Sequence, residues 1–126
     1  MAIIGIGTDI IEIKRIEDGL RRSERLARRV LTDNEFKQFR EHSQPARFLA
    51  KRFAAKEAAV KAIGNGIGNG VSFKQVEVSN GNFGEPYISF SGQMQHICEQ
   101  RGVTRRFISI SDEQHYAVAT VVLESV

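Results

Sequence analysis

The chain has 126 residues, of which 41% are hydrophobic and 26% charged, and its formal net charge is +3. This length suits one domain with a single core, and the composition excludes a largely disordered, collagen-like or proline-rich chain. The apolar stretches are too short to span a bilayer, the N-terminus does not match a secretory signal, and the single cysteine, Cys98, excludes an internal disulfide. We therefore expect one cytoplasmic domain over residues 1–126, with no membrane partner.

The beginning of the chain predicts a strand followed by a helix. Ile3–Thr8 is a short apolar run with two glycines, typical of a buried strand, and Asp9 follows at its end. From Ile10 to Ala27 apolar residues recur at intervals of three or four, which predicts an amphipathic helix, weakened locally at Gly19.

Two further helices are predicted in the first half. Thr32 and Glu35 match a capping box, which indicates a short helix to about Glu41. A longer, alanine-rich helix follows over residues 45–64, with glycine at its end in a position that favours a left-handed backbone. The glycine-rich GNGIGNG segment at 64–70 is predicted to be a loop.

The second half of the chain is mostly predicted as strands. Alternating residues and turn signals indicate a hairpin, a helix and two final strands. The predicted elements are strands at Phe73–Ser79, Tyr87–Phe90, Arg105–Ser111 and Tyr116–Glu124, and a helix at Ser91–Arg101. Together the elements predict a single α+β domain, a mostly antiparallel sheet packed with helices.

Residues 14–29 carry the basic character of the chain, with seven Lys or Arg and three Asp or Glu. Arg15, Arg22, Arg25 and Arg29 share one face if the predicted helix is continuous. A charged helix face is usually only solvated, but so local an excess indicates an acidic partner. No aromatic residue that could stack on a base accompanies it, which argues against single-stranded nucleic acid.

Asp9 and the helix Arg52–Ala62 carry the candidate chemistry. Asp9 is either a helix cap or a working carboxylate, and its position alone leaves both open. Glu57 and Lys61 lie four apart on one helix face, a spacing that usually makes a surface ion pair. Alanines and phenylalanines around them indicate a mostly buried helix, in which a charge needs a partner. If Asp9 and Glu57 meet, two carboxylates with no His or Cys nearby favour the binding of Mg²⁺, which normally bridges carboxylates to phosphate oxygens. Lys61 would then neutralise charge on that phosphate.

Other motifs are weaker. The GNGIGNG loop lacks the spacing of known phosphate-binding loops and follows its helix, so a plain connection is the simpler interpretation. The three histidines fit no zinc spacing, and no Ser/His/Asp or Cys/His arrangement stands out.

Four segments follow one another in an order that resembles a known family: GIGTDIIEIKRI, RFAAKEAAVKAIGNGIG, GEPYI and SISDEQHYAVATVVLE. Over essentially the whole chain they resemble the bacterial holo-[acyl-carrier-protein] synthases, the small-chain type of 4′-phosphopantetheinyl transferase. The resemblance implies an enzyme of fatty acid biosynthesis. It would move the 4′-phosphopantetheine group of coenzyme A to a serine of apo acyl carrier protein and release adenosine 3′,5′-bisphosphate.

The resemblance also implies roles for individual residues. The metal-binding acids of the family match Asp9 and Glu57, and its phosphate-contacting lysine matches Lys61. We expect contacts with coenzyme A from Arg52, Lys61, Gly64 and Gly66, and docking of the acidic carrier protein on Arg15, Arg22 and Arg25. The family is a homotrimer with active sites between subunits. Some members have a histidine where this chain has Asp112, so no histidine role is transferred, and the roles of Asp112 and Glu113 are open.

The resulting hypothesis is a Mg²⁺-dependent transfer. With the ion held by Asp9 and Glu57, Glu57 removes the proton of the carrier serine, directly or through water, and Lys61 stabilises phosphate charge. One alternative is a non-enzymatic module that binds nucleic acid through residues 14–29, although we expect no nucleic-acid partner. A second alternative is another coenzyme A or nucleotide-phosphate enzyme on the same fold.

Overall fold

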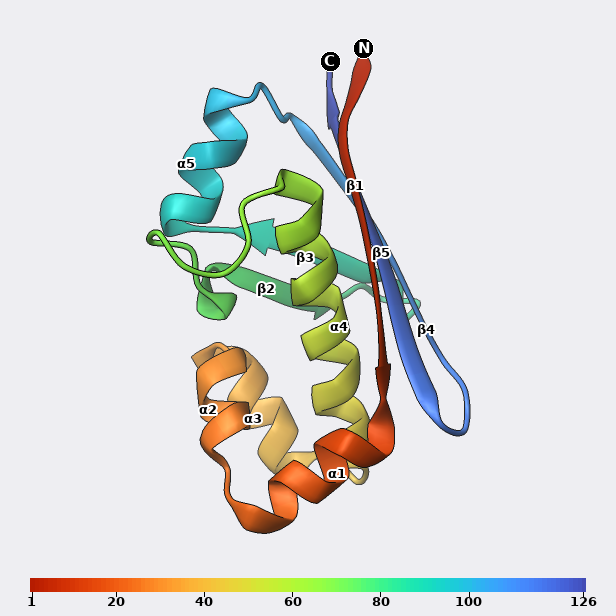
Figure 1. The fold of residues 1–126 in the computed structure, drawn as a ribbon. Helices are drawn as coiled ribbons and strands as arrows, with labels where there is room; N and C mark the ends of the chain where they lie inside the picture. The colour runs from red at the N-terminus through yellow and green to blue at the C-terminus, as the bar shows by residue number, and fades with distance from the viewer.

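A three-stranded antiparallel sheet forms one side of the molecule in the computed structural model, which describes residues 1–126. Its strands are β1 (Ala2–Glu12), β5 (Tyr116–Ser125) and β4 (Arg105–Asp112), in that order. The first and last strands of the chain therefore pair along their length, and the two termini lie together at one end (Figure 1). A separate antiparallel hairpin, β2 (Val76–Asn80) and β3 (Pro86–Phe90), runs across the direction of the long strands (Figure 1).

The central helix α4 (Pro45–Ile63) packs against β1 and β5. Proline at its first position and Gly64 at its end, with φ of 74°, give it clear limits, as predicted. Its alanines are almost all fully buried, which lets the sheet approach closely. The approach also requires glycine on β1, because a Cβ atom at Gly7 would lie 1.9 Å from the carbonyl oxygen of Ala58.

Four shorter helices complete the fold. Helices α1 (Ile13–Arg22), α2 (Arg25–Val30) and α3 (Asp33–Glu41) surround the N-terminal half of α4 at the end opposite the termini (Figure 1). A 3-10 turn (Phe73–Gln75) precedes the hairpin, and helix α5 (Gly92–Gln100) follows the hairpin. One cluster of buried hydrophobic side chains joins all these elements. The predicted α+β class is confirmed, and no helix is both long and apolar enough to cross a membrane.

Two predictions about the first thirty residues were wrong. The first strand does not end at Thr8 but continues to Glu12, so Asp9 lies inside β1 opposite Ala119 and is not a helix cap. The helix predicted over residues 10–27 is two helices, broken at Ser23 and not at Gly19. Pairing with β5, more than a hundred residues away in the chain, extends the strand, and no local pattern reveals that partner.

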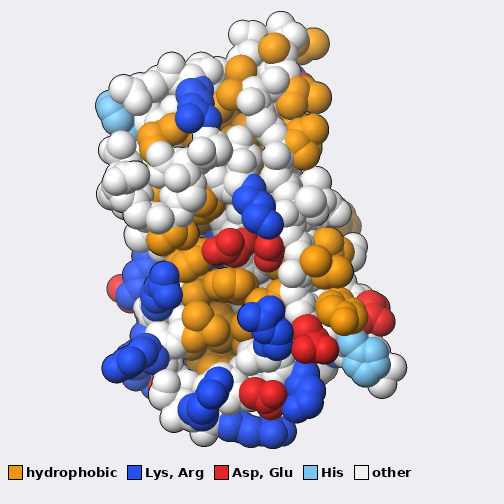
Figure 2. Space-filling view, viewed as in Figure 1, with side chains coloured by type: hydrophobic (Ala, Val, Ile, Leu, Met, Phe, Trp, Pro, Cys, Tyr) orange, Lys and Arg blue, Asp and Glu red, His pale blue; other side chains and the backbone are white.

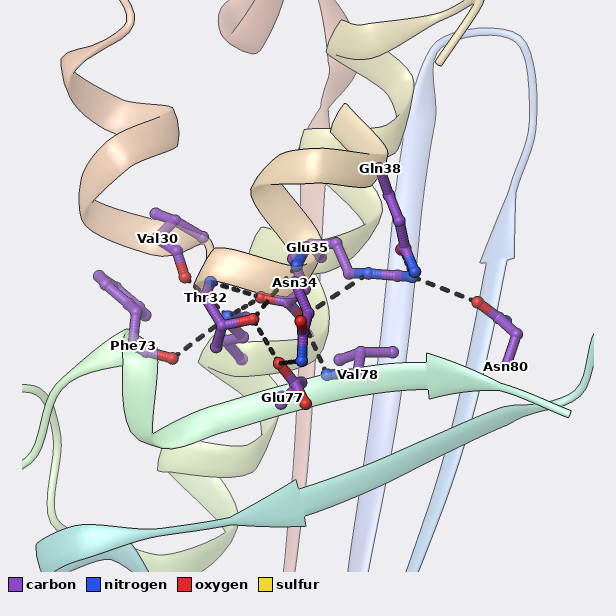
Figure 3. Close-up of polar contacts among 11 residues, drawn as sticks. Val30, Thr32, Asn34, Glu35, Gln38, Phe73, Glu77, Val78 and Asn80 are labelled. Carbon is purple, nitrogen blue, oxygen red and sulfur yellow. Dashed lines mark hydrogen bonds and ion pairs between the residues drawn. The ribbon is translucent and has the colours of Figure 1, made fainter. Parts of the chain in front are cut away.

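A buried group of charges, the inner ion cluster (Glu35, Arg52 and Lys56), joins the helices to β2 (Figure 3). Lys56 is 0% exposed, and its ammonium group donates to Glu35, to the carbonyl of Val30 at 2.7 Å and to that of Phe73 at 3.2 Å. Glu35 also accepts a bond from the backbone N–H of Val78 at 2.8 Å. Every donor of Lys56 is therefore used.

Glu35 also completes the predicted capping box, which is confirmed. Its side chain accepts from the backbone N–H of Thr32, whose hydroxyl oxygen accepts from the N–H of Glu35. One carboxylate thus caps α3 and also pairs with α4. The capping signal was visible in the sequence, but the buried partner on α4 was not.

Candidate active site

Three predicted residues lie together where β1 crosses α4. Asp9 is on the same side of β1 as Gly7, and the ammonium nitrogen of Lys61 lies 2.9 Å from its Oδ1. Lys61 also donates to the backbone carbonyl of Thr8 at 3.1 Å. Glu57 is one helical turn before Lys61, and it lies close enough to Asp9 for the two negative charges to interact. We call Asp9 and Glu57 the acidic pair.

The Glu57 carboxylate is half-buried and has no hydrogen bond or ion pair within the chain, since Lys61 pairs with Asp9. Burial raises the pKa of Glu57, and the negative charge of Asp9 raises it further, while Lys61 and Arg29 act in the opposite direction. Such a carboxylate holds its proton more firmly than usual, and a cation or a proton donor beside it would be stabilised.

The acidic pair fits a hard divalent cation. Both ligands are carboxylate oxygens, and a cation between them would relieve the repulsion that raises the pKa of Glu57. No group of three or more His, Cys, Asp or Glu side chains in the chain could hold a metal ion by itself. A cation here would take its remaining ligands from water or phosphate, as Mg²⁺ commonly does.

Aromatic and basic side chains adjoin the acidic pair. Phe53 lies one turn before Glu57 on α4, its ring 5.6 Å from that of Phe73, and the guanidinium of Arg29 lies 5.5 Å from the Phe73 ring. On this face of the molecule an apolar area lies below a small acidic area, and basic side chains surround the apolar area (Figure 2). Phe53 and Arg29 thus bring apolar and basic groups near the acidic pair.

The predicted docking arginines are all exposed but do not share one helix. Arg15 lies in α1, Arg22 ends α1, and Arg25 begins α2, so the single face predicted for them was wrong. None of the three forms an ion pair, whereas the neighbouring Arg21 pairs with acids of α1, and Arg28 pairs with Glu24, the residue before α2. The three unpaired guanidinium groups are therefore free to meet an acidic partner.

A second candidate site is a cavity of about 380 Å³ beside the N-terminal half of α4, bordered by the β2–β3 hairpin. Arg47, Lys51 and Arg52 line it, and we call it the cation pocket. Sequence reasoning missed Arg47 and Lys51, although their spacing of four on one helix was a usable signal. Arg52 is five residues before Glu57, which turns the two side chains about 140° apart round α4.

Arg52 belongs to both the pocket and the inner ion cluster. One terminal nitrogen donates to Gln38 at 3.3 Å and Asn80 at 3.2 Å, and its Nε lies 3.7 Å from Glu35 without a hydrogen bond (Figure 3). The guanidinium stacks 4.6 Å from the Phe48 ring. Burial lowers the pKa of Arg52, which Glu35 counteracts. The side chain is thus held in place from several directions.

The remaining predicted residues lie near these two sites. Gly64 and Gly66, with φ of 74° and 77°, are in the loop that begins one turn after Lys61. Asp112 pairs with Arg47 and Lys51, and the Glu113 side chain accepts bonds from backbone N–H groups of its own turn. Neither acid contacts the acidic pair within the chain.

Comparison with known proteins identifies the class. A family model described as the 4′-phosphopantetheinyl transferase superfamily matches residues 5–121, and the chain belongs to that superfamily. The holo-[acyl-carrier-protein] synthase of Alteromonas mediterranea is 64% identical over 126 residues, 100% of both chains. These matches confirm the predicted family and the predicted enzyme class, a holo-[acyl-carrier-protein] synthase-like phosphopantetheinyl transferase. They do not support the alternative of a non-enzymatic nucleic-acid-binding module.

Solved structures give the same result. The holo-[acyl-carrier-protein] synthase of Neisseria meningitidis superposes with a TM-score of 0.92 at 38% identity, covering 98% of this chain and 100% of the other. The synthase of Bacillus anthracis in complex with coenzyme A (3′,5′-ADP) has a TM-score of 0.82 at 42% identity and 98% coverage of each chain.

Proposed function

We propose that this chain transfers the 4′-phosphopantetheine group of coenzyme A to a serine of apo acyl carrier protein, in the cytoplasm and in the service of fatty acid biosynthesis. The serine oxygen forms a bond to the phosphorus nearest the pantetheine arm, the pyrophosphate bond breaks, and adenosine 3′,5′-bisphosphate leaves. Residues 1–126 act as one transferase domain. The observation that carries the proposal is the meeting of Asp9, Glu57 and Lys61 in a chain of this family.

Each residue of the site has a role in this reaction. Asp9 and Glu57 would hold Mg²⁺, which would stabilise negative charge on the phosphate oxygens. Glu57 accepts the proton of the carrier serine, directly or through a water molecule. Lys61 stabilises charge on the leaving phosphate, and Gly64 and Gly66 bring backbone N–H groups near the coenzyme.

The adenosine 3′,5′-bisphosphate part of coenzyme A occupies the cation pocket. Arg47, Lys51 and Arg52 offer positive charge in the lining of a cavity large enough for a nucleotide. This pocket and the acidic pair face different sides of α4, which favours a site completed by a second subunit. We therefore place each active site between two subunits, with the acidic pair from one and the cation pocket from its neighbour.

The outer face of the three-stranded sheet supports this assembly. Ile6 and Ile10 are 61% and 65% exposed, and Phe107, at 48%, lies in one row with Ile6 across Val122 of the middle strand. Apolar side chains so exposed on one sheet face favour burial against another subunit. We propose a homotrimer that buries this face.

The surface beside the acidic pair receives the carrier protein. The unpaired guanidinium groups of Arg15, Arg22 and Arg25 attract an acidic partner. Phe53, one turn before Glu57, offers the docked carrier protein an apolar contact. This arrangement brings the carrier serine to the acidic pair.

The intact mass of apo acyl carrier protein after incubation with this protein, coenzyme A and Mg²⁺ tests the proposed reaction. We expect a gain of one phosphopantetheine group, lost when EDTA removes the metal. No gain with a verified apo carrier would overturn the proposed function. A gain that persists after exhaustive chelation would overturn the metal's part in it.

Mixing two inactive variants tests the shared site. Glu57→Gln damages only the acidic pair, and Lys51→Glu damages only the cation pocket. If each site joins two subunits, trimers assembled from both variants recover part of the activity, because some sites combine two intact halves. A mixture that exchanges subunits and stays inactive would place both halves in one chain.

A further inference from the structure

The cation pocket has carboxylate partners supplied by the chain itself. Asp112, the last residue of β4, lies 2.8 Å from a terminal nitrogen of Arg47 and 3.4 Å from the ammonium nitrogen of Lys51. The third cation, Arg52, faces Glu35. The pocket is therefore less positive than its three cations alone would make it.

Asp112 reaches these cations from outside the cavity. Arg47 and Lys51 line the cavity, whereas Asp112 does not, and its side chain is 27% exposed. A phosphate that enters the cavity does not need to displace Asp112 but shares two cations with it. Burial alone would raise the pKa of Asp112, but the hydrogen bond from Arg47 and the charge of Lys51 lower it below its usual range, so the carboxylate is ionised at neutral pH.

The charge of the nucleotide rises during the proposed reaction. In coenzyme A the 5′-phosphate is part of a pyrophosphate, and after transfer it is a terminal phosphate that carries close to two negative charges at neutral pH. A pocket of uncompensated cations would then bind the product more tightly than the substrate, and product release would be slow.

We propose that Asp112 is a built-in counter-charge that weakens binding of adenosine 3′,5′-bisphosphate in the cation pocket and so favours its release. The inference rests on the proposed function, because it takes this nucleotide as the occupant. Asp112 is a tuning residue that acts through Arg47 and Lys51 and touches no reacting atom. Its place at the end of β4 keeps it beside both cations while the cavity stays open.

Asp112→Asn tests the inference with little risk to the fold. The side chain keeps its size, and Arg47 still donates to the backbone carbonyls of Glu113 at 2.7 Å and Gln114 at 3.2 Å. Glu99→Gln on α5 is the matched control, since it removes one exposed acid that forms no ion pair. A third variant, Asp112→Glu, keeps a negative charge at this position.

The measurement is calorimetric titration of each variant with adenosine 3′,5′-bisphosphate. We expect Asp112→Asn to bind about three- to tenfold more tightly, Glu99→Gln and Asp112→Glu to stay near wild type, and product inhibition of transfer to strengthen by a similar factor. In a Lys51→Gln background the gain from Asp112→Asn should shrink, because one shared cation is missing.

Two failures are distinguishable. Unchanged or weaker binding by Asp112→Asn, in a preparation whose wild type transfers phosphopantetheine, overturns this inference alone. A wild type that neither transfers the group nor binds the bisphosphate overturns the proposed function and this inference with it.

Discussion

Lys56 and Glu57 are neighbours on α4, yet they belong to opposite kinds of charged site. Lys56 is 0% exposed, and its three donors all have partners in the inner ion cluster. Glu57 is half-buried, has no partner in the chain and lies beside another negative charge. For these two neighbours, the number of satisfied partners separates the structural charge from the functional one more clearly than burial does.

The two regions also differ in what they connect. The inner ion cluster ties α3, α4 and β2 together, so its loss disturbs the packing of the helical half. The acidic pair joins only β1 and α4, which already pack through glycine and alanine. We therefore expect substitutions of Glu35 or Lys56 to change stability and substitutions in the acidic pair to change turnover.

The largest effect is expected from Glu57→Gln. This change keeps the shape of the side chain but removes the proposed base and metal ligand, so kcat should fall about 10²- to 10⁴-fold. The free energy of unfolding and the oligomeric state should stay near wild type, because the amide relieves repulsion with Asp9. Transfer assays and light scattering measure both, and near-normal kcat would remove Glu57 from the site.

Lys56→Met should show the reverse pattern. It removes the closest counter-charge of the buried Glu35 and leaves only the more distant Arg52, which costs about 3–5 kcal/mol of the free energy of unfolding. Urea unfolding measures the loss, while kcat per folded molecule should change only a few-fold. Replacing Glu35 with Gln in the same chain should recover part of the stability. A large loss of kcat at full stability would contradict the assignment of Lys56 to structure.

Gly7→Ala tests the contact that brings the acidic pair together. Its Cβ would lie 1.9 Å from the carbonyl oxygen of Ala58, so β1 and α4 must separate. We expect a loss of about 1–3 kcal/mol in the free energy of unfolding, together with lower transfer activity because Asp9 moves away from Glu57.

Gly19→Ala is the control for this substitution, because a Cβ atom there meets nothing within 4 Å. Alanine inside α1 should stabilise the chain by up to about 1 kcal/mol and leave transfer unchanged. If both glycine variants behaved alike, the close approach of β1 to α4 would not be what positions Asp9.

The same distinction explains what the sequence predicted. The capping box at Thr32 and the helix end at Gly64 are local signals, and both were found. The spacing of Glu57 and Lys61 placed them on one helix face. The inner ion cluster was missed because Glu35 and Lys56 are far apart in the chain, and the role of each depends on the other.

Asp9 and the cation pocket show the same limit. The residues after Thr8 fit a helical spacing as well as an alternating one, and only pairing with β5 decides between them. Arg47 and Lys51 form a pocket only because the β2–β3 hairpin lies beside α4. Functional groups that lie on a single helix or strand could be predicted from the sequence. Sites that form between two or more elements could be identified only from the folded structure.

The smallest effect is expected at Arg22, which has no ion pair although the adjacent Arg21 pairs with Glu17 and Asp18. Because Arg22 is exposed, reversing its charge should mainly slow encounter with the acidic carrier. Arg22→Glu should raise KM for the carrier about three- to tenfold, weaken the salt dependence of kcat/KM, and leave kcat and coenzyme A binding within about twofold. Lys37→Glu on α3, another exposed and unpaired cation, makes the same change in net charge and should alter KM much less. An equal rise in both variants would mean that the carrier senses total charge, and no rise at Arg22 would move the docking surface away from the junction of α1 and α2.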